Sequence, residues 1–239
     1  MYNIVMNTPE ALVVDDFLPQ DVWDKIWNQI QVDKWSQTGA DDKFWHYTDG
    51  INYKNNKRWL TKGPFNDNSD LWFKHFTEFL DTCPEAKLFA KDYIEIAMRC
   101  HAYPIGSKNP WHNDLGFTTY TYYLHRHWQI NWDSTLLILP LGSIDYQQVL
   151  PLEDGTVHYD CYTDTNSPME MFQQGKKYQP IIDYGLGTFV SPKPNRLILI
   201  NKKVVHGITA VDKDAGENTR VTLTGMIMES DWRETNDLF

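Results

Sequence analysis

The chain has 239 residues, of which 41% are hydrophobic, and it contains 10 Trp, 13 Tyr and 11 Phe. This length fits one domain, and the aromatic residues can fill a sizeable core. The 22 Lys and Arg residues against 32 Asp and Glu residues give a formal net charge of −10. Such a balance opposes bulk attraction to nucleic acid or to an anionic membrane, so we expect neither as a partner.

The sequence has the features of a cytoplasmic protein. No apolar run approaches the length of a transmembrane helix, and the first residues lack a basic stretch followed by a long apolar one, so we expect no secretory signal. Three cysteines, Cys83, Cys100 and Cys161, are widely spaced and odd in number. They indicate reduced thiols rather than a disulfide or zinc framework.

Two amphipathic helices are predicted in residues 1–90, which we interpret as a helical support region. In DDFLPQDVWDKIWNQI, Pro19 lies near the helix start, and five apolar residues from Val22 to Ile30 share one face. SDLWFKHFTEFLDTC repeats this pattern, with Ser69 as a candidate N-cap. The polar segment between the two helices predicts a loop or short edge strands.

From about Asp92 the hydrophobic pattern changes to a period of two, as in YIEIAMRCHAY. Short segments rich in β-branched and aromatic residues follow, separated by Gly, Pro, Asn and Asp: TTYTYYL, STLLILPL, GTFVSP, NRLILINKK, VVHGITAV and TRVTLTGMIME. Six or more short strands without helices between them favour an antiparallel sandwich or jelly roll. We therefore expect one mainly β domain over residues 1–239, with a jelly-roll core in residues 91–230 and flanking N-terminal helices.

A His-x-Asp motif at His112 and Asp114 is the first candidate metal site. On an extended segment these two side chains point the same way, so they can converge on one ion. A second imidazole from a distant strand would complete the two-His, one-carboxylate triad of non-haem Fe(II) oxygenases. His206 is the natural partner, because it begins an apolar strand near the end of the chain.

Each part of this motif also has an ordinary interpretation. A second His-x-Asp, formed by His158 and Asp160, occurs in a polar segment. Fewer predicted strands lie between His158 and His206 than between His112 and His206. A jelly roll needs those intervening strands to bring the two histidines together, so we favour His112 and Asp114. An isolated strand histidine such as His206 can also be a core residue that is bonded to a backbone carbonyl.

Arg220 provides an independent indication of a site. Val221, Leu223 and Ile227 alternate with Arg220 and Thr222 along one strand, so if the apolar face packs under the helices, Arg220 and Thr222 face the interior. A buried guanidinium is costly without an anion, and a dicarboxylate would pair with it bidentately. An exposed Arg at a strand start is the ordinary alternative.

Three further aromatic and histidine signals lie near these residues. His125 and His127 form a His-x-His pair in a predicted loop. Arg126, His127 and Trp128 are candidates for the rim of a substrate mouth. Trp111, next to His112, either lines the site or packs in the core.

These pieces, in this order, resemble the 2-oxoglutarate/Fe(II)-dependent dioxygenases, particularly their prolyl 4-hydroxylase-like branch. The resemblance rests on HAYPIG before HND, then YTYYL, WDSTLLIL, FVSPKPNRLILIN, VVHGITAV and NTRVTLTGMI, and on ALVVDDFLPQDVWDKI near the N-terminus. It implies a double-stranded β-helix in which His112, Asp114 and His206 hold iron. It also implies that Arg220 pairs with the distal carboxylate of 2-oxoglutarate, with Thr222, Tyr103 and Tyr120 as further cosubstrate contacts.

The activity implied by the resemblance is hydroxylation of an aliphatic C–H bond with O₂ and 2-oxoglutarate, with ascorbate as a reductant. A prolyl residue of a peptide or protein is the first substrate class, and a free amino acid or other small metabolite is the second. Two positions depart from the family: relatives often have Lys in place of Arg220, and often have Gly-Gly where this chain has Asp133-Ser134. The second departure lies near the substrate in relatives, so it weakens the transfer of a prolyl substrate.

Two other functions explain part of the pattern. A non-catalytic, carbohydrate-binding jelly roll would account for the fold and the 14% aromatic content, but it leaves His112, Asp114, His206 and Arg220 to coincidence. A metal-binding cupin with another activity needs no buried arginine. The sequence does not indicate an oligomeric state.

Overall fold

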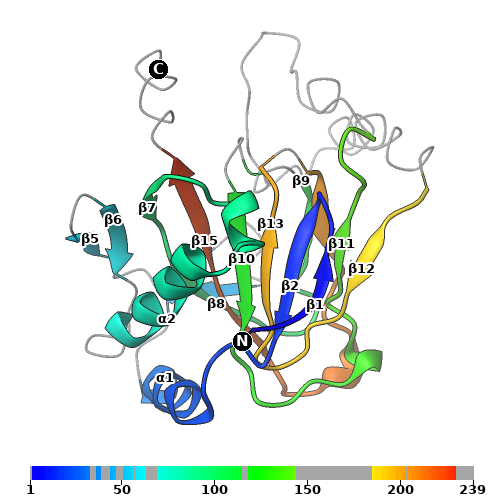
Figure 1. The fold of residues 1–239 in the computed structure, drawn as a ribbon. Helices are drawn as coiled ribbons and strands as arrows, with labels where there is room; N and C mark the ends of the chain where they lie inside the picture. Colours follow the sequence, from blue (N-terminus) through cyan, green and yellow to red (C-terminus); the bar gives the residue numbers. More distant parts are fainter. Residues whose placement is uncertain are drawn as a thin grey trace, which may run out of the picture.

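The structure, a computed structural model, describes residues 2–32, 36–38, 44–46, 51–55, 58–62, 69–112, 114, 118–143, 185–202 and 204–229. Two β-sheets make up most of it, and two helices cover the outer side of the larger sheet (Figure 1). The expectation of a mainly β jelly roll with flanking helices is confirmed. None of the described helices is long and apolar enough to cross a membrane.

The larger sheet runs in the order β1-β2-β13-β10-β15-β7-β6-β5, and β8 pairs with both β15 and β4, which in turn pairs with β3. Its strands are β1 (Asn3–Asn7), β2 (Ala11–Asp15), β3 (Ser36–Thr38), β4 (Phe44–His46), β5 (Ile51–Asn55), β6 (Arg58–Lys62), β7 (Tyr93–Ile96), β8 (Arg99–Tyr103), β10 (Thr118–Tyr123), β13 (Leu197–Ile200) and β15 (Arg220–Glu229). The described pairs are antiparallel except β6 with β7.

The smaller sheet has the order β12-β11-β14-β9. Its strands are β9 (Asn109–His112), β11 (Leu136–Ile138), β12 (Thr188–Val190) and β14 (His206–Ile208). The helices are α1 (Gln20–Val32) and α2 (Ser69–Thr82), with short 3₁₀ helices η2 (Ala86–Leu88), η3 (Ile130–Trp132) and η4 (Lys213–Ala215). Both sheets combine strands from distant parts of the sequence, as a jelly roll requires.

Both predicted helices are present, and the described parts of the polar segment between them are short strands. Besides the helices, residues 1–90 contribute β1 and β2 to one edge of the larger sheet, which the sequence did not predict. The residues of β2, ALVVD, are all buried. Leu12 and Val14 join the core beneath the helices, while Ala11 and Val13 join a second core. A short apolar run buried on both faces lacks the alternation that reveals a strand.

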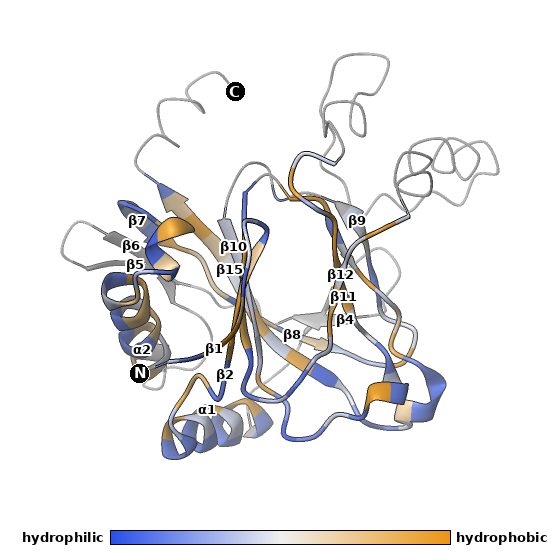
Figure 2. Cartoon of the chain, turned by 45° about the vertical axis from the view of Figure 1, so that its right-hand side comes forward, coloured by the Kyte–Doolittle hydropathy of each residue, from blue (hydrophilic) through white to orange (hydrophobic). Residues whose placement is uncertain are grey.

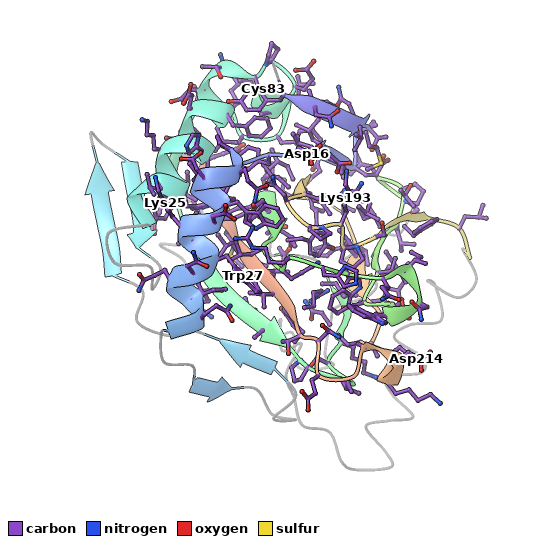
Figure 3. All side chains as sticks on the ribbon, turned by 90° about the horizontal axis from the view of Figure 1, so that it is seen from below. Asp16, Lys25, Trp27, Cys83, Lys193 and Asp214 are labelled. Atoms are coloured by element: carbon purple, nitrogen blue, oxygen red, sulfur yellow. The ribbon has the colours of Figure 1, made fainter. Side chains whose placement is uncertain are left out.

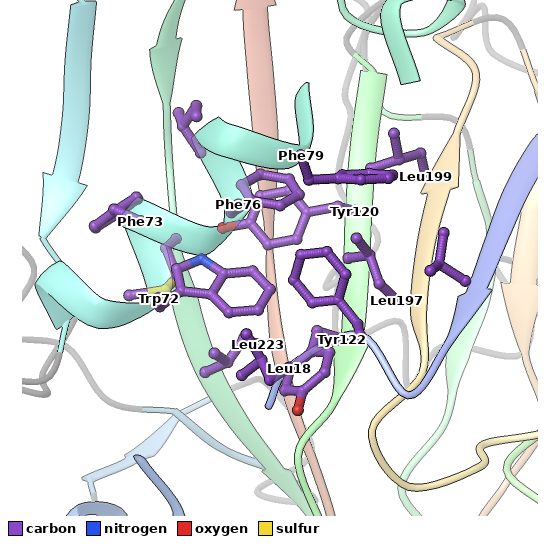
Figure 4. Close-up of a cluster of buried hydrophobic side chains, with 14 of the residues drawn as sticks. Leu18, Trp72, Phe73, Phe76, Phe79, Tyr120, Tyr122, Leu197, Leu199 and Leu223 are labelled. Atoms are coloured by element: carbon purple, nitrogen blue, oxygen red, sulfur yellow. The ribbon is translucent and has the colours of Figure 1, made fainter. Parts of the chain in front are cut away.

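The main core lies between the helices and the larger sheet. The apolar sides of α1 and α2 face the strands, and their polar sides face outward (Figure 2). Trp72 stacks on Phe76 at 5.1 Å and on Tyr120 at 5.8 Å between ring centroids. Figure 4 shows this cluster, in which rings from α2 meet side chains of β10, β13 and β15. Burial of aromatic rings dominates the energetics of such a core, and replacing one of these rings by alanine costs about 3–5 kcal/mol of stability.

A buried ion pair fixes the loop before β13. Arg196 Nε donates to Asp15 Oδ1 at 2.6 Å, and Arg196 Nη2 donates to Asp15 Oδ2 at 3.1 Å. Lys193, labelled in Figure 3, adds a third contact to Asp15 at 2.8 Å. Burial raises the pKa of Asp15, but the two cations together lower it by a larger amount, so its pKa lies below the ordinary value.

Candidate active site

Two strands of the smaller sheet bring the first candidate ligands together. The antiparallel register places His206, at the start of β14, directly opposite His112, at the end of β9. Asp114 follows β9, and its Oδ2 lies 3.2 Å from His206 Nε2. Residues opposite one another in adjacent strands point to the same side of a sheet. The register therefore places residues 112 and 206 at the same point of the smaller sheet, and the side chain of His112 lies outside the described residues.

His206 is almost fully buried, and its surroundings determine which ring nitrogen is available. Its Nδ1 lies 3.2 Å from the carbonyl oxygen of Val204, which suits a proton on that nitrogen. Burial lowers the pKa of His206, but the charge and hydrogen bond of Asp114 raise it more, so the net direction is upward. The carbonyl therefore orients the imidazole with Nε2 toward the carboxylate.

The His206–Asp114 contact fits a shared cation. With the proton on Nδ1, Nε2 and the carboxylate oxygen are both acceptors, and such a pair needs a proton or a cation between them. Two ligands bound at about 2.1 Å and at right angles are separated by about 3 Å, close to the observed 3.2 Å. Among the described side chains no group of three or more His, Cys, Asp or Glu residues could hold a metal ion, so completion of this site depends on His112.

Arg220 lies in the interior, as its position on β15 predicts. Its neighbours Val221 and Leu223 pack in the core beneath the helices, which turns Arg220 and Thr222 to the opposite face. Arg220 is 1% exposed. Its Cζ lies 4.0 Å from the centroid of the Tyr103 ring, on the neighbouring strand β8. This stacking holds the plane of the guanidinium by a cation–π contact.

The guanidinium is incompletely satisfied by the described residues. Nη1 donates to the carbonyl oxygen of Ser134 at 3.3 Å, whereas Nε has no hydrogen-bond partner. No ion pair between Arg220 and a carboxylate occurs within the described part of the chain. A buried, unpaired charge is strongly unfavourable unless an anion binds beside it. The chemistry of this position therefore fits a bound carboxylate.

Three hydroxyl groups near Arg220 are also buried and have no hydrogen-bond partner among the described residues: those of Thr222, Tyr123 and Ser134. Tyr123 on β10 lies directly opposite Thr222 on β15. Burial raises the pKa of Tyr123, and the Arg220 charge only partly opposes this, so the phenol stays protonated and can donate. Hydroxyls and guanidinium together form a set of unused donors of the kind that binds an anion.

The expectation that Tyr120 contacts a cosubstrate was wrong. Tyr120 lies on the opposite face of β10, where its ring packs against Trp72 and Phe76 in the core beneath the helices (Figure 4). Its hydroxyl donates to the carbonyl oxygen of Ala97 at 2.9 Å. Strand parity explains the error, because Tyr120 and Tyr123 point to opposite faces. Tyr123 is the residue that sequence reasoning missed, and pairing with Thr222 is the signal that identifies it.

The His-x-His pair is not a metal site in this structure. His125 lies with Nδ1 3.2 Å from the Val221 carbonyl oxygen and Nε2 2.8 Å from that of Pro192. Both ring nitrogens therefore face backbone acceptors. Burial lowers the pKa of His125 to about 4, so the ring is neutral near pH 7. His127 points elsewhere and packs edge-on against Trp132.

The remaining candidates are structural by their contacts. Arg126 pairs with Asp24 and stacks 4.5 Å above Trp23, which ties α1 to the end of β10 rather than forming a substrate rim. Trp128 donates from its indole to the Asp133 carbonyl oxygen at 3.0 Å. Trp111 packs over Gly207, where an added Cβ would lie 3.2 Å from the indole, on the face of the smaller sheet opposite His206.

The second His-x-Asp motif, His158 and Asp160, lies outside the described residues.

Comparison with solved structures identifies proteins with a similar fold. A prolyl-4-hydroxylase from Pseudomonas putida matches with a TM-score of 0.54 and 12% identity, over 92% of each chain. A prolyl hydroxylase from Trichoplax adhaerens, solved with a hypoxia inducible factor peptide, matches with a TM-score of 0.57 and 11% identity, over 96% of this chain and 88% of that one. The chain has the fold of these prolyl hydroxylases.

The prolyl hydroxylase fold also occurs in HygX from Streptomyces hygroscopicus, solved with nickel and 2-oxoglutarate bound. HygX matches with a TM-score of 0.51 and 9% identity, over 92% of this chain and 83% of that one. No protein-family model matches the sequence, and neither does any curated protein. The resemblance seen in the sequence is thus confirmed for the fold, and the chemistry has to be argued from the residues.

Proposed function

We propose that this protein is a 2-oxoglutarate- and Fe(II)-dependent dioxygenase that hydroxylates an aliphatic C–H bond. The observation that carries the proposal is the buried guanidinium of Arg220, whose Nε lacks a partner beside three unpartnered hydroxyls. A dicarboxylate with one end free for a metal suits such a set of donors. The His206–Asp114 pair in the facing sheet supplies the second half of the site.

The residues divide into metal ligands and cosubstrate contacts. His112, Asp114 and His206 would hold Fe(II) and leave coordination positions open for 2-oxoglutarate and O₂. Arg220 would pair with the distal carboxylate, with hydrogen bonds from Thr222 and Tyr123. The iron with 2-oxoglutarate supplies the oxidising power for attack on an unactivated C–H bond.

The protein itself binds and orients the cosubstrate and keeps water out of the site. The Tyr103 ring lies against the Arg220 guanidinium at 4.0 Å and restricts its rotation, so the carboxylate meets donors that are already in place. The Val204 carbonyl orients His206 in the same manner. Arg220, Thr222 and Tyr123 are all at most 1% exposed. Their electrostatic contacts with a ligand are therefore not weakened by bulk water.

For the substrate, a prolyl residue of a peptide or protein is the first proposal. It is supported by the fold shared with prolyl hydroxylases, one of which was solved with a peptide. A free amino acid or small metabolite is the second, because Asp133-Ser134 replaces a Gly-Gly common in that branch. We propose a cytoplasmic location from the reduced-thiol pattern of the sequence, and two of the three cysteines, Cys83 and Cys100, are buried.

The proposal is tested by following 2-oxoglutarate turnover. Purified protein with Fe(II), ascorbate and air should form succinate slowly on its own and faster when a true substrate is added. A panel of proline-containing peptides and free amino acids identifies the class. His206→Ala should abolish both rates. A protein that binds a glycan array without metal and forms no succinate would instead be the carbohydrate-binding jelly roll.

A further inference from the structure

The segment between η3 and β11 contains two consecutive residues in a backbone conformation that glycine favours. Asp133 has φ 55° and ψ −131°, and Ser134 has φ 61°. Gly216 has nearly the same angles as Asp133, φ 57° and ψ −127°. A side chain in such a conformation is strained and persists only when its surroundings enforce it.

Several contacts enforce the conformation of this dipeptide. The Trp128 indole donates to the Asp133 carbonyl oxygen at 3.0 Å, and Thr209 Oγ1 donates to Asp133 Oδ1 at 2.5 Å. The backbone N–H of Ser134 donates to the Ala210 carbonyl oxygen at 3.1 Å. These bonds come from both sides of the dipeptide, so they fix where the Ser134 side chain and carbonyl lie.

The strained backbone places the Ser134 carbonyl oxygen at Arg220, with the hydroxyl of the same residue close by. The Ser134 carbonyl oxygen accepts a hydrogen bond from Arg220 Nη1 at 3.3 Å. Ser134 is fully buried, and its hydroxyl has no hydrogen-bond partner. Because this hydroxyl belongs to the same residue as the carbonyl, covalent geometry keeps it in the immediate neighbourhood of the guanidinium. A buried hydroxyl left unpaired is unfavourable unless a ligand completes it.

The unused donors around Arg220 suit one carboxylate. Among the described residues, Arg220 Nε and the hydroxyls of Tyr123, Thr222 and Ser134 are each buried without a partner. An ionised carboxylate has two oxygens with about four lone-pair sites. Arg220 carries the positive charge, and the neighbouring His125 is neutral near pH 7 because burial lowers its pKa. Four donors around one cation are therefore suited to a single anionic carboxylate.

We propose that Ser134 is a cosubstrate-binding residue. Its hydroxyl donates to the carboxylate that Arg220 binds, and its carbonyl oxygen positions the guanidinium for that contact. This inference rests on the proposed function, since 2-oxoglutarate is the ligand whose distal carboxylate is bound. It also gives a physical reason for a side chain at a position whose backbone favours glycine: the hydroxyl compensates in the complex for the strain in the free protein.

Two substitutions separate the hydroxyl from the strain. Ser134→Ala removes the hydroxyl and keeps the strained backbone, while Ser134→Gly removes both. Binding of 2-oxoglutarate to the Fe(II)-loaded protein without oxygen is measured by isothermal titration calorimetry, and Tm is measured on the ligand-free protein. Ser107→Ala is the matched control, because Ser107 is another buried serine with an unpartnered hydroxyl but has no recorded contact with Arg220 among the described residues.

We expect both Ser134 variants to raise the Kd for 2-oxoglutarate on the order of 10- to 100-fold, the usual effect of losing a hydrogen bond to a charged group. The Kd for 2-oxopentanoate, which has a methyl group in place of the distal carboxylate, should change little. Ser134→Gly should raise the Tm by about 3 °C through relief of strain. Ser107→Ala should leave the Kd unchanged.

Two results would overturn the assignment while leaving the proposed function intact. One is wild-type protein that binds 2-oxoglutarate and a Ser134→Ala variant that binds it equally well. The other is an equal loss of affinity in Ser107→Ala, which would assign the effect to the polarity of the interior in general. Wild-type protein that binds no 2-oxoglutarate at all would instead contradict the proposed function.

Discussion

Two arginines in the described part of the chain, the half-buried Arg196 and the buried Arg220, have opposite surroundings. Arg196 meets Asp15 through two parallel hydrogen bonds and donates a third to the Ser191 carbonyl oxygen. Arg220 is more deeply buried, yet in the described part of the chain its only hydrogen bond is to the carbonyl oxygen of Ser134. The first guanidinium is satisfied within the fold, and the second is not. The contrast separates an arginine that stabilises the protein from one that is ready for a ligand.

The tyrosines of β10 repeat this contrast. On the helix side, the Tyr122 hydroxyl donates to Asn195 Oδ1 at 2.8 Å, and Tyr120 donates to a backbone carbonyl. On the interior side, the Tyr123 hydroxyl has no partner. Trp72 Nε1 is the exception, since it is buried and unpartnered on the helix side. Unused donors thus gather on one face of the strand, around Arg220.

The largest expected effect is on stability, from Arg196→Leu. This change leaves the Asp15 carboxylate buried with only Lys193 as a charged partner, and breaking a buried pair costs about 3–5 kcal/mol. Urea unfolding measures the loss of free energy of unfolding. At a temperature where the variant is folded, its Kd for 2-oxoglutarate should equal that of the wild type; a matching loss of affinity would remove the distinction between the two arginines.

Arg220→Leu should have the reverse profile. The Kd for 2-oxoglutarate should rise about 100-fold or more, because a carboxylate would then be buried without its cation. The free energy of unfolding of the ligand-free protein should stay equal or increase, since an unpaired buried charge is removed. Calorimetry and urea unfolding report the two quantities, and Fe(II) binding should be retained. Strong destabilisation without ligand would mean that Arg220 is already satisfied within the chain.

A matched pair of tyrosine variants sharpens the comparison on a single strand. Tyr123→Phe should raise the Kd for 2-oxoglutarate about 10-fold, with little change in stability, because its hydroxyl has no partner to lose. Tyr122→Phe should lower the free energy of unfolding by about 1 kcal/mol through loss of the bond to Asn195, with unchanged affinity. Equal affinities for the two variants would contradict the assignment of Tyr123 to the site.

The smallest effect is a change in pH dependence. The Arg196 and Lys193 charges depress the pKa of Asp15 below its ordinary value of 3.8, so its contribution is present above that pH and is lost as the pH falls through the folded-state pKa. Asp15→Asn should therefore lower the free energy of unfolding by about 1 kcal/mol at pH 7. The difference from the wild type should shrink below about pH 4. A constant difference across this range would rule out ionisation of Asp15 as the cause.

Periodicity was sufficient to predict the elements whose apolar residues gather on one face. The helix around Trp72 carries its apolar residues on one side, the strand that begins at Arg220 alternates apolar with other residues, and both elements are present. Periodicity could not predict β2, because residues 11–15 are buried on both faces and show no alternation. The strand at residues 11–15 was missed for that reason, although both helices in residues 1–90 were predicted.

The sequence predicted which residues face the interior better than it predicted which of them lie next to one another. Strand parity correctly turned Arg220 and Thr222 inward, but the choice between Tyr120 and Tyr123 requires the register of β10 against β15, which the sequence does not display. The positive φ of Ser134 was also hidden, because serine rarely adopts such a conformation. Long-range pairing sets both features.

The most direct test of the account is a titration of 2-oxoglutarate into the Fe(II)-loaded protein without oxygen, followed by visible absorbance. The account predicts a saturable charge-transfer band in the wild type. It also predicts that the band is lost in His206→Ala and is shifted to much higher ligand concentration in Arg220→Leu. A wild type that binds Fe(II) but develops no band at any 2-oxoglutarate concentration would contradict the central claim.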